Sequence, residues 1–168
     1  KHLLDPRIDR PRYGRPLHIL VAGAGGNGSK VAIGLRHLAS ALQALFDNQL
    51  TLHVTVADDD TLEHHNLVRQ AFYPSDLGQN KATVLVNRIN LSSGTTWDAL
   101  PRHLTSEDVV RLRPDIVIAC VDNRQARRVI HEGADSPRSG VTYTLDLGNT
   151  ATSGQVILGV PKHAHDRS

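Results

Sequence analysis

The chain has 168 residues, with 19 Lys and Arg against 17 Asp and Glu, a single cysteine and no methionine. This length suits one domain with a proper core, and one cysteine excludes a disulfide framework. No secretory signal opens the chain and no apolar run reaches about eighteen residues, so we expect a cytoplasmic protein without a membrane partner.

The chain begins with a basic arm, residues 1–16, which holds five basic and two acidic residues. Its net charge of +3 contrasts with −1 for the remainder, which has fourteen basic and fifteen acidic residues. The body therefore lacks the broad positive field of nucleic-acid binding, and we expect no nucleic-acid partner. Because residue 1 is Lys, we also expect the natural chain to start earlier.

Apolar patterns predict alternating strands and helices along the body, residues 17–160, which a polar tail, 161–168, follows. We expect strands at 18–22, 50–56, 115–120, 141–145 and 155–160, and helices at 29–45, 79–89, 105–112 and 123–133. Thr105 and Asp108 have the spacing of a capping box. The order predicts an α/β fold with a Rossmann-like, doubly wound and mainly parallel sheet.

A glycine-rich turn follows the first predicted strand, with Gly23, Gly25, Gly26 and Gly28 in the pattern G-x-G-G-x-G. Strand, turn and helix N-terminus together present backbone N–H groups to a phosphate. The glycines also let the backbone approach a ligand closely. The alternative is a tight crossover with no ligand.

An acidic cluster ends the second predicted strand. Asp58 stands where nucleotide-binding folds put the carboxylate that holds ribose hydroxyls. Asp59 and Asp60 add charge, and their alternative is a solvated turn, which we favour for Asp59.

Polar residues that suit phosphates come next. Asn66 and Arg69 are three positions apart and share a face if this segment is helical. Arg offers a planar fork for phosphate oxygens, although a surface ion pair is its alternative. Lys81 opens the following helix, where a lone lysine is more often solvated.

Asp122 follows the predicted strand 115–120, at the sheet edge where ligands of open α/β folds bind. A carboxylate there can hold Mg²⁺ against phosphates. Its alternative is the N-cap of the next helix.

The strings G-x-G-G-x-G, D-x-D, N-L-x-R-Q, G-Q-x-K and C-x-D-N, in this order, resemble the ThiF/MoeB/HesA family, bacterial relatives of ubiquitin-activating enzymes. The match runs from about His18 to Val160. Residues 143–158 are more narrowly similar to the ThiF-type protein of the plasmid-borne PRTRC gene system.

The resemblance implies that ATP adenylates the C-terminal glycine carboxylate of a small ubiquitin-like protein. It implies Mg²⁺, a homodimer, and an N-terminal Arg that reaches the partner's ATP; the candidates are Arg7, Arg10, Arg12 and Arg15. The motifs imply nucleotide-binding roles for Gly23, Gly25, Gly26, Gly28, Asp58, Asp60, Asn66, Arg69, Gln70, Lys81, Asp122 and Asn123. Within this set Asp122 would hold the metal, and Arg69, Lys81 and Asp122 would be catalytic, since they offset charge on the α-phosphate.

The chain departs from the family pattern in its cysteines. Two Cys-x-x-Cys pairs hold zinc in many members; this chain has neither, so we expect no structural zinc. Cys120 lies on a predicted buried strand, which favours a small core residue over a thioester nucleophile.

Two other functions remain open from the sequence. A nicotinamide-dependent oxidoreductase explains the glycine turn and Asp58, but leaves Asn66, Arg69 and Lys81 without roles. A non-catalytic scaffold of the same fold is consistent with the missing cysteines.

Overall fold

The computed structural model describes residues 15–46, 50–67, 72–149 and 152–162. They form a six-stranded sheet in the order β3-β2-β1-β4-β5-β6. Only β6 is antiparallel to its neighbour. The strands are β1 (Leu17–Ala22), β2 (Leu52–Ala57), β3 (Asp98–Leu100), β4 (Ile116–Ala119), β5 (Tyr143–Asn149) and β6 (Gly154–Gly159).

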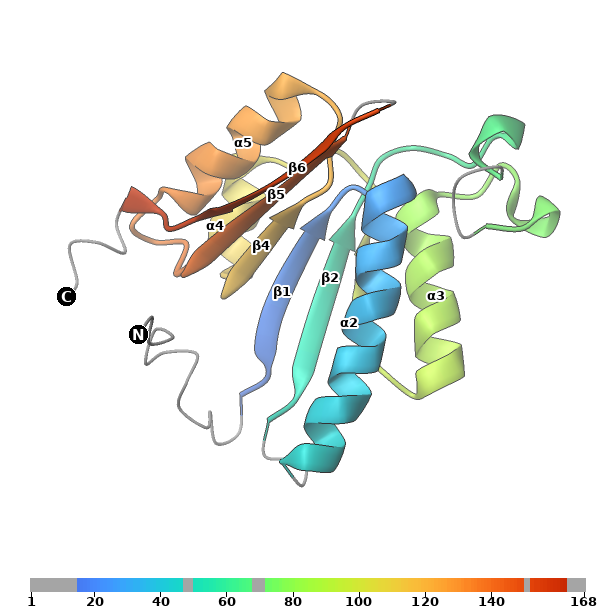
Figure 1. The fold of residues 1–168 in the computed structure, drawn as a ribbon, viewed down its shortest axis with the longest axis horizontal. Coiled ribbons are helices and arrows are strands. Elements are labelled where there is room, and N and C mark those ends of the chain that lie inside the picture. The colour runs from blue at the N-terminus through green and yellow to red at the C-terminus, as the bar shows by residue number, and fades with distance from the viewer. Residues whose placement is uncertain (1–14, 47–49, 68–71, 150–151, 163–168) are drawn as a thin grey trace.

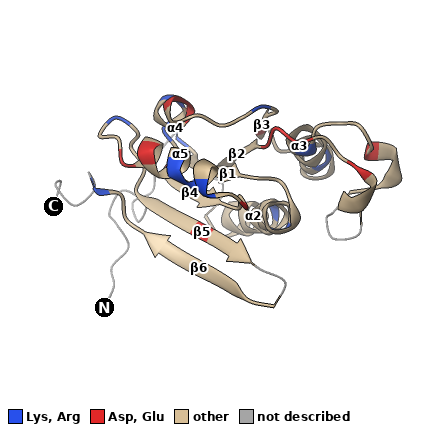
Figure 2. Ribbon diagram, turned by 90° about the horizontal axis from the view of Figure 1, so that it is seen from above, with Lys and Arg blue, Asp and Glu red and all other residues tan. Residues whose placement is uncertain are grey.

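Helices cover both faces of the sheet, as Figure 2 shows from above. One core joins β1 and β2 to α2 and α3, and a second core packs α4 and α5 against the other face. The helices are α2 (Gly26–Leu45), α3 (Lys81–Ser93), α4 (Ser106–Leu112) and α5 (Arg124–Ala134), with the short 3₁₀ turns η1 (His64–Asn66) and η2 (Pro74–Asp76). This architecture confirms the predicted Rossmann-like α/β fold.

Local sequence explains where these elements begin and end. The central strand β1 buries Leu20 and Val21 on opposite faces, as expected of a strand covered by helices on both sides. Helix α3 begins at the Asn80 cap, whose side chain accepts from the Thr83 N–H, and ends at Gly94 with a φ of 65°. The predicted capping box of Thr105 and Asp108 starts α4.

The sequence did not predict β3, because three residues ending before Pro101 are too short to show an alternating pattern. Helix α2 begins at Gly26, three residues before the predicted start. Strand β5 extends to Asn149, whereas the pattern ended it at 145.

The strand β6 forms the outer edge of the sheet and is largely exposed, including Val156, Ile157 and Leu158. Among the described residues, no helix has the length and apolar character needed to cross a membrane. The arm at 1–14 and the tail at 163–168 lie outside the described residues, so the proposed division into arm, body and tail stays a prediction.

Candidate functional site

A cavity of about 940 Å³ lies at the edge of the sheet where β1, β2 and β4 end. In Figure 1 the arrowheads of these strands meet beside the first turn of α2. Of the residues predicted from sequence, the cavity wall contains Gly23, Gly25, Gly26, Asp58, Asp59, Asp60, Asn66, Lys81, Asp122 and Asn123.

The glycine turn is fixed by steric constraints at two positions. Gly23 has a φ of 94°, and a Cβ there would lie 2.8 Å from the carbonyl oxygen of Cys120. Gly28 lies behind the cavity wall, where a Cβ would overlap the carbonyl oxygen of Gly23. The Gly23 N–H donates to the carbonyl of Ala57 at 2.7 Å, which ties the turn to the end of β2. Glycine is therefore required at 23 and 28 by packing alone.

The first turn of α2 opens onto the cavity without a side-chain cap. Its N-cap, Gly25, makes no side-chain hydrogen bond, and the turn holds no acidic residue. Free N–H groups and the positive end of the helix dipole attract an anion. Lys30, exposed one turn further on, also lines the cavity and adds a positive charge. This end of the cavity suits a phosphate.

Asp58 joins the glycine turn to the loop after β2. One carboxylate oxygen accepts from the Ala24 N–H at 2.5 Å, and the other from the Asp60 N–H at 2.9 Å. Burial raises the pKa of the Asp58 carboxyl above its usual value, and these two N–H donors oppose that effect. Each oxygen retains room for another donor, so the position suits ribose hydroxyls.

Lys81 lies in the cavity wall with its side chain only 8% exposed, and its Nζ is 2.6 Å from an oxygen of Asp60. Asn80 fixes the same loop, because its side-chain nitrogen donates to the carbonyls of Asp58 and Asp60. The buried ammonium of Lys81 is thus held at the cavity by the exposed carboxylate of Asp60. A phosphate bound there would share this ammonium with Asp60.

Asp59 is not only a solvated turn residue, which was the favoured interpretation. Its carboxylate lies 2.9 Å from Nδ1 of His103, and this hydrogen bond lowers the pKa of Asp59. The pair links the end of β2 to the segment after β3.

Asn66 is 4% exposed and lines the cavity. Its side-chain oxygen accepts from the Glu63 N–H at 2.9 Å and closes a capping box around η1. Within the described residues its side-chain nitrogen has no hydrogen-bond partner, and a buried donor without a partner suits a ligand oxygen. Arg69 and Gln70 lie outside the described residues.

Asp122 is exposed, one residue before the N-cap of α5. The cap is Asn123, whose oxygen accepts from the Ala126 N–H at 2.8 Å, so the alternative of Asp122 as the cap is wrong. Among the described residues, the only side-chain hydrogen bond to Asp122 is a long one, from the Asn123 side-chain nitrogen at 3.5 Å. A carboxylate that is this open at a cavity edge fits Mg²⁺, which keeps several waters and few protein ligands.

Cys120 follows β4 rather than lying within it, and it is partly buried in the cavity wall. Burial and the nearby Asp146 raise the pKa of its thiol to about 12. A thiol that stays protonated at neutral pH is a poor nucleophile.

Several cavity residues were not anticipated from the sequence. Arg102 and His103 line the cavity because they follow β3, a strand that the sequence pattern did not predict. Asn27 and Asn149 approach from α2 and the end of β5, where their side chains hydrogen bond at 3.0 Å. Lys30 could have been found, since it lies one helical turn after Gly26 in the predicted turn-helix unit.

The chain matches the ThiF family over residues 14–163. It belongs to this family. The "Adenylyltransferase and sulfurtransferase UBA4" of Yarrowia lipolytica is 31% identical over 133 residues, 71% of this chain and 28% of that protein. The "Ubiquitin-like modifier-activating enzyme 5" of Oryza sativa subsp. japonica is 25% identical over 171 residues, 92% of this chain and 38% of that protein.

Solved structures share the fold. The tRNA N6-threonylcarbamoyladenosine dehydratase TcdA of E. coli superposes with a TM-score of 0.61 at 21% identity, over 77% of this chain and 51% of that one. This chain therefore spans about half or less of these relatives. The ThiF-type resemblance is confirmed, and the narrower similarity to the PRTRC protein stays a prediction.

Proposed function

We propose that this chain carries the adenylation site of an enzyme that activates a small ubiquitin-like protein with ATP and Mg²⁺. The observation that carries the proposal is the composition of the cavity at the ends of β1, β2 and β4. The same cavity is lined by the uncapped N–H groups of α2 and by Asp58, which suits ribose. It is also lined by the buried Lys81 and the exposed Asp122. A dinucleotide site has no evident use for the last two.

Each group has a role in the proposed reaction. Asp58 holds the ribose, and the first turn of α2 holds a phosphate. Lys81, with Asn66 and Arg69, offsets the charge that builds on the α-phosphate. Gln70 and Asn123 line the polyphosphate, and Asp60 positions the Lys81 ammonium. A magnesium ion held by Asp122 would neutralise phosphate oxygens.

The chemistry is a nucleotidyl transfer, in which the adenylyl group of ATP passes to a carboxylate oxygen. A carboxylate oxygen of the substrate's C-terminal glycine forms a bond to the α-phosphorus of ATP. The bond from that phosphorus to the bridging oxygen breaks, and pyrophosphate leaves. The product is an acyl-adenylate. With Cys120 protonated, the proposed reaction of this chain stops at the adenylate.

A cytoplasmic location and a homodimer complete the proposal. Arg15 interacts with Asp115 of its own chain, at the opposite end of the strands, so Arg7, Arg10 and Arg12 are the candidates to reach a partner's ATP. Replacing these three by Ala should slow pyrophosphate exchange about tenfold or more, because each charge-assisted phosphate contact is worth about 1.5–3 kcal/mol. An unchanged rate of pyrophosphate exchange would show that these arginines of the arm have no catalytic role.

The test is incubation with ATP, Mg²⁺ and a panel of small ubiquitin-like proteins that end in glycine, followed by mass spectrometry. We expect an adenylated product and pyrophosphate with at least one member. The same member without its terminal glycine is the control and should not react. ATP binding without any product across the panel would contradict adenylation and favour a nucleotide-binding scaffold.

A further inference from the structure

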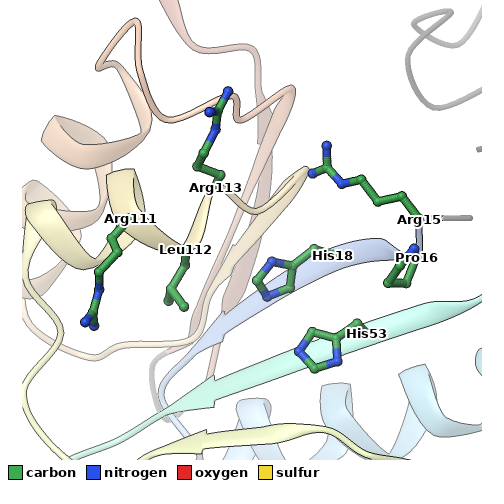
Figure 3. A pocket seen from close by; sticks show the side chains of 7 residues that line it. All are labelled: Arg15, Pro16, His18, His53, Arg111, Leu112 and Arg113. Atoms are coloured by element: carbon green, nitrogen blue, oxygen red, sulfur yellow. The ribbon is translucent and has the colours of Figure 1, made fainter.

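A second cavity, of about 440 Å³, lies at the opposite edge of the sheet, where β1 and β2 begin and α4 ends. Figure 3 shows the side chains that line it: Arg15, Pro16, His18, His53, Arg111, Leu112 and Arg113. We call it the basic pocket. The proposed function does not involve this pocket. The two cavities lie at opposite ends of the parallel strands β1 and β2, so they are one strand length apart.

The charge of the basic pocket is one-sided. Three arginines line it, and no carboxylate does within the described part of the chain. The carboxylate of Asp115, buried beneath, lies 3.5 Å from Arg15, which is a loose contact. Arg111 bonds to Asp108 at 2.8 Å, but Asp108 is also held by Arg102. Asp108 is therefore shared by two arginines, and Asp115 makes only a loose contact with Arg15.

Arg113 is the least compensated of these cations. None of the described residues pairs with its exposed guanidinium. Its backbone has a φ of 49°, the only positive value for a non-glycine residue in the described segments. The position is the C-cap of α4, where glycine is most easily accommodated. Backbone strain at this position, for a side chain that pairs with none of the described residues, points to a function of the Arg113 side chain.

Two histidines shape the floor of the basic pocket. His18 and His53 are paired across β1 and β2, and their ring centroids are 5.0 Å apart. Nε2 of His18 hydrogen bonds to the Thr55 hydroxyl at 2.9 Å, and burial lowers the pKa of His18. His53 bonds to Asp98 at 3.1 Å. These internal bonds fix both rings, so the arginines remain as the groups available to a ligand.

We propose that the basic pocket binds the phosphate group of a small phosphate ester, held between Arg15 and Arg113. In Figure 3 these two side chains stand on opposite sides of the pocket, Arg15 just before β1 and Arg113 just after α4, and Arg15 points toward the Arg113 side. The planar guanidinium fork matches phosphate oxygens, and two forks suit a dianion. The volume lies within the range of about 300–1,000 Å³ for small-molecule sites, so it has room for more than phosphate.

The test is an NMR titration that follows the ring protons of His18 and His53, since these report on the basic pocket and not on the glycine turn. The probes are glycerol 3-phosphate, inorganic phosphate and citrate at constant ionic strength. We expect saturable shifts with both phosphates, tighter binding of glycerol 3-phosphate, and at least fivefold weaker binding of citrate. Binding would weaken about tenfold or more in R15Q/R113Q, and also measurably in R113Q, which breaks no ion pair between described residues.

The control variant is R128Q, because Arg128 is 80% exposed on α5 and pairs only with Glu132 among the described residues. It removes the same charge outside the pocket and should leave phosphate binding unchanged. Shifts that never saturate, equal weakening in R128Q, or tighter binding of citrate would each overturn the proposal. Tighter binding of inorganic phosphate than of glycerol 3-phosphate would overturn the choice of an ester.

Discussion

The two ends of the parallel sheet carry cavities of opposite character. Among the described residues, the cavity at the carboxyl ends of the strands is lined by four aspartates and three lysines or arginines, together with backbone groups of the glycine turn. In the part of the chain that the structure describes, the basic pocket at the other end has three arginines and no carboxylate in its wall. Different ligand chemistry follows from this difference.

Strand direction explains the contrast. Loops that leave the carboxyl ends of parallel strands lead into helix N-termini, which supply N–H groups for phosphates and leave acids free for ribose and metal. At the amino ends, helices finish with exposed carbonyls, so an anion there depends on side-chain cations. Helix α4 connects the two ends, because Asp108 binds Arg102 of the first cavity and Arg111 of the basic pocket.

The largest expected effect comes from Gly28→Ala. A Cβ there overlaps the Gly23 carbonyl, so α2 must shift away from β1 and the phosphate end of the cavity is lost. We expect the free energy of unfolding to fall by at least about 1–3 kcal/mol and ATP binding to disappear. Chemical denaturation and calorimetry measure the two effects.

Gly34→Ala is the matched control in the same helix, because a Cβ at Gly34 has no atom within 4 Å. It should raise stability by about 0.5–1 kcal/mol and leave ATP binding intact. If both variants behaved alike, the steric explanation of the turn would be wrong.

The second prediction separates metal binding from helix capping. Asp122→Ala should weaken ATP binding about tenfold to a hundredfold with Mg²⁺ present, equivalent to about 1.5–3 kcal/mol, and hardly at all without Mg²⁺. Its melting temperature should not change, since Asn123 is the cap. Asn123→Ala should lower stability by about 0.5–2 kcal/mol. A Mg²⁺ effect that survives in Asp122→Ala would contradict the role of Asp122.

The sequence predicted what local patterns encode. The glycine turn and the strands on either side of α2 follow from runs of adjacent residues, and so does the aspartate after β4. Contacts that depend on tertiary pairing were not predicted. Strand β3 is too short to show an alternating pattern, so Arg102 and His103 were not predicted as cavity residues. The pairing of His18 with His53 depends on the register of β1 and β2, which the sequence pattern does not give.

The third prediction concerns the link between the two ends. Arg102 lowers the pKa of the Asp108 carboxyl, so this carboxylate stabilises the fold above its unfolded pKa of about 4, and the contribution is lost as pH falls below that. Asp108→Asn should therefore cost about 1 kcal/mol or more at pH 7, and less at pH 3. Urea unfolding at both pH values measures this. A constant difference between wild type and variant would contradict the assignment.

The smallest expected effect is that of Cys120→Ala on ATP binding, which should stay within a factor of about two. In the wild type, iodoacetamide should label the folded protein slowly at pH 8, because burial keeps the thiol protonated. Rapid labelling at pH 8, or a thioester trapped on Cys120, would contradict this prediction and show that Cys120 is a nucleophile.

Calorimetric titration with ATP and with NAD, each in the presence of Mg²⁺, tests the central claim most directly. The cavity at the carboxyl ends of the strands offers Lys81 and an open Asp122 to a polyphosphate, and a dinucleotide has no use for both. We predict that ATP binds more tightly than NAD and that removal of Mg²⁺ weakens ATP binding. Tighter binding of NAD, unaffected by Mg²⁺, would contradict the account.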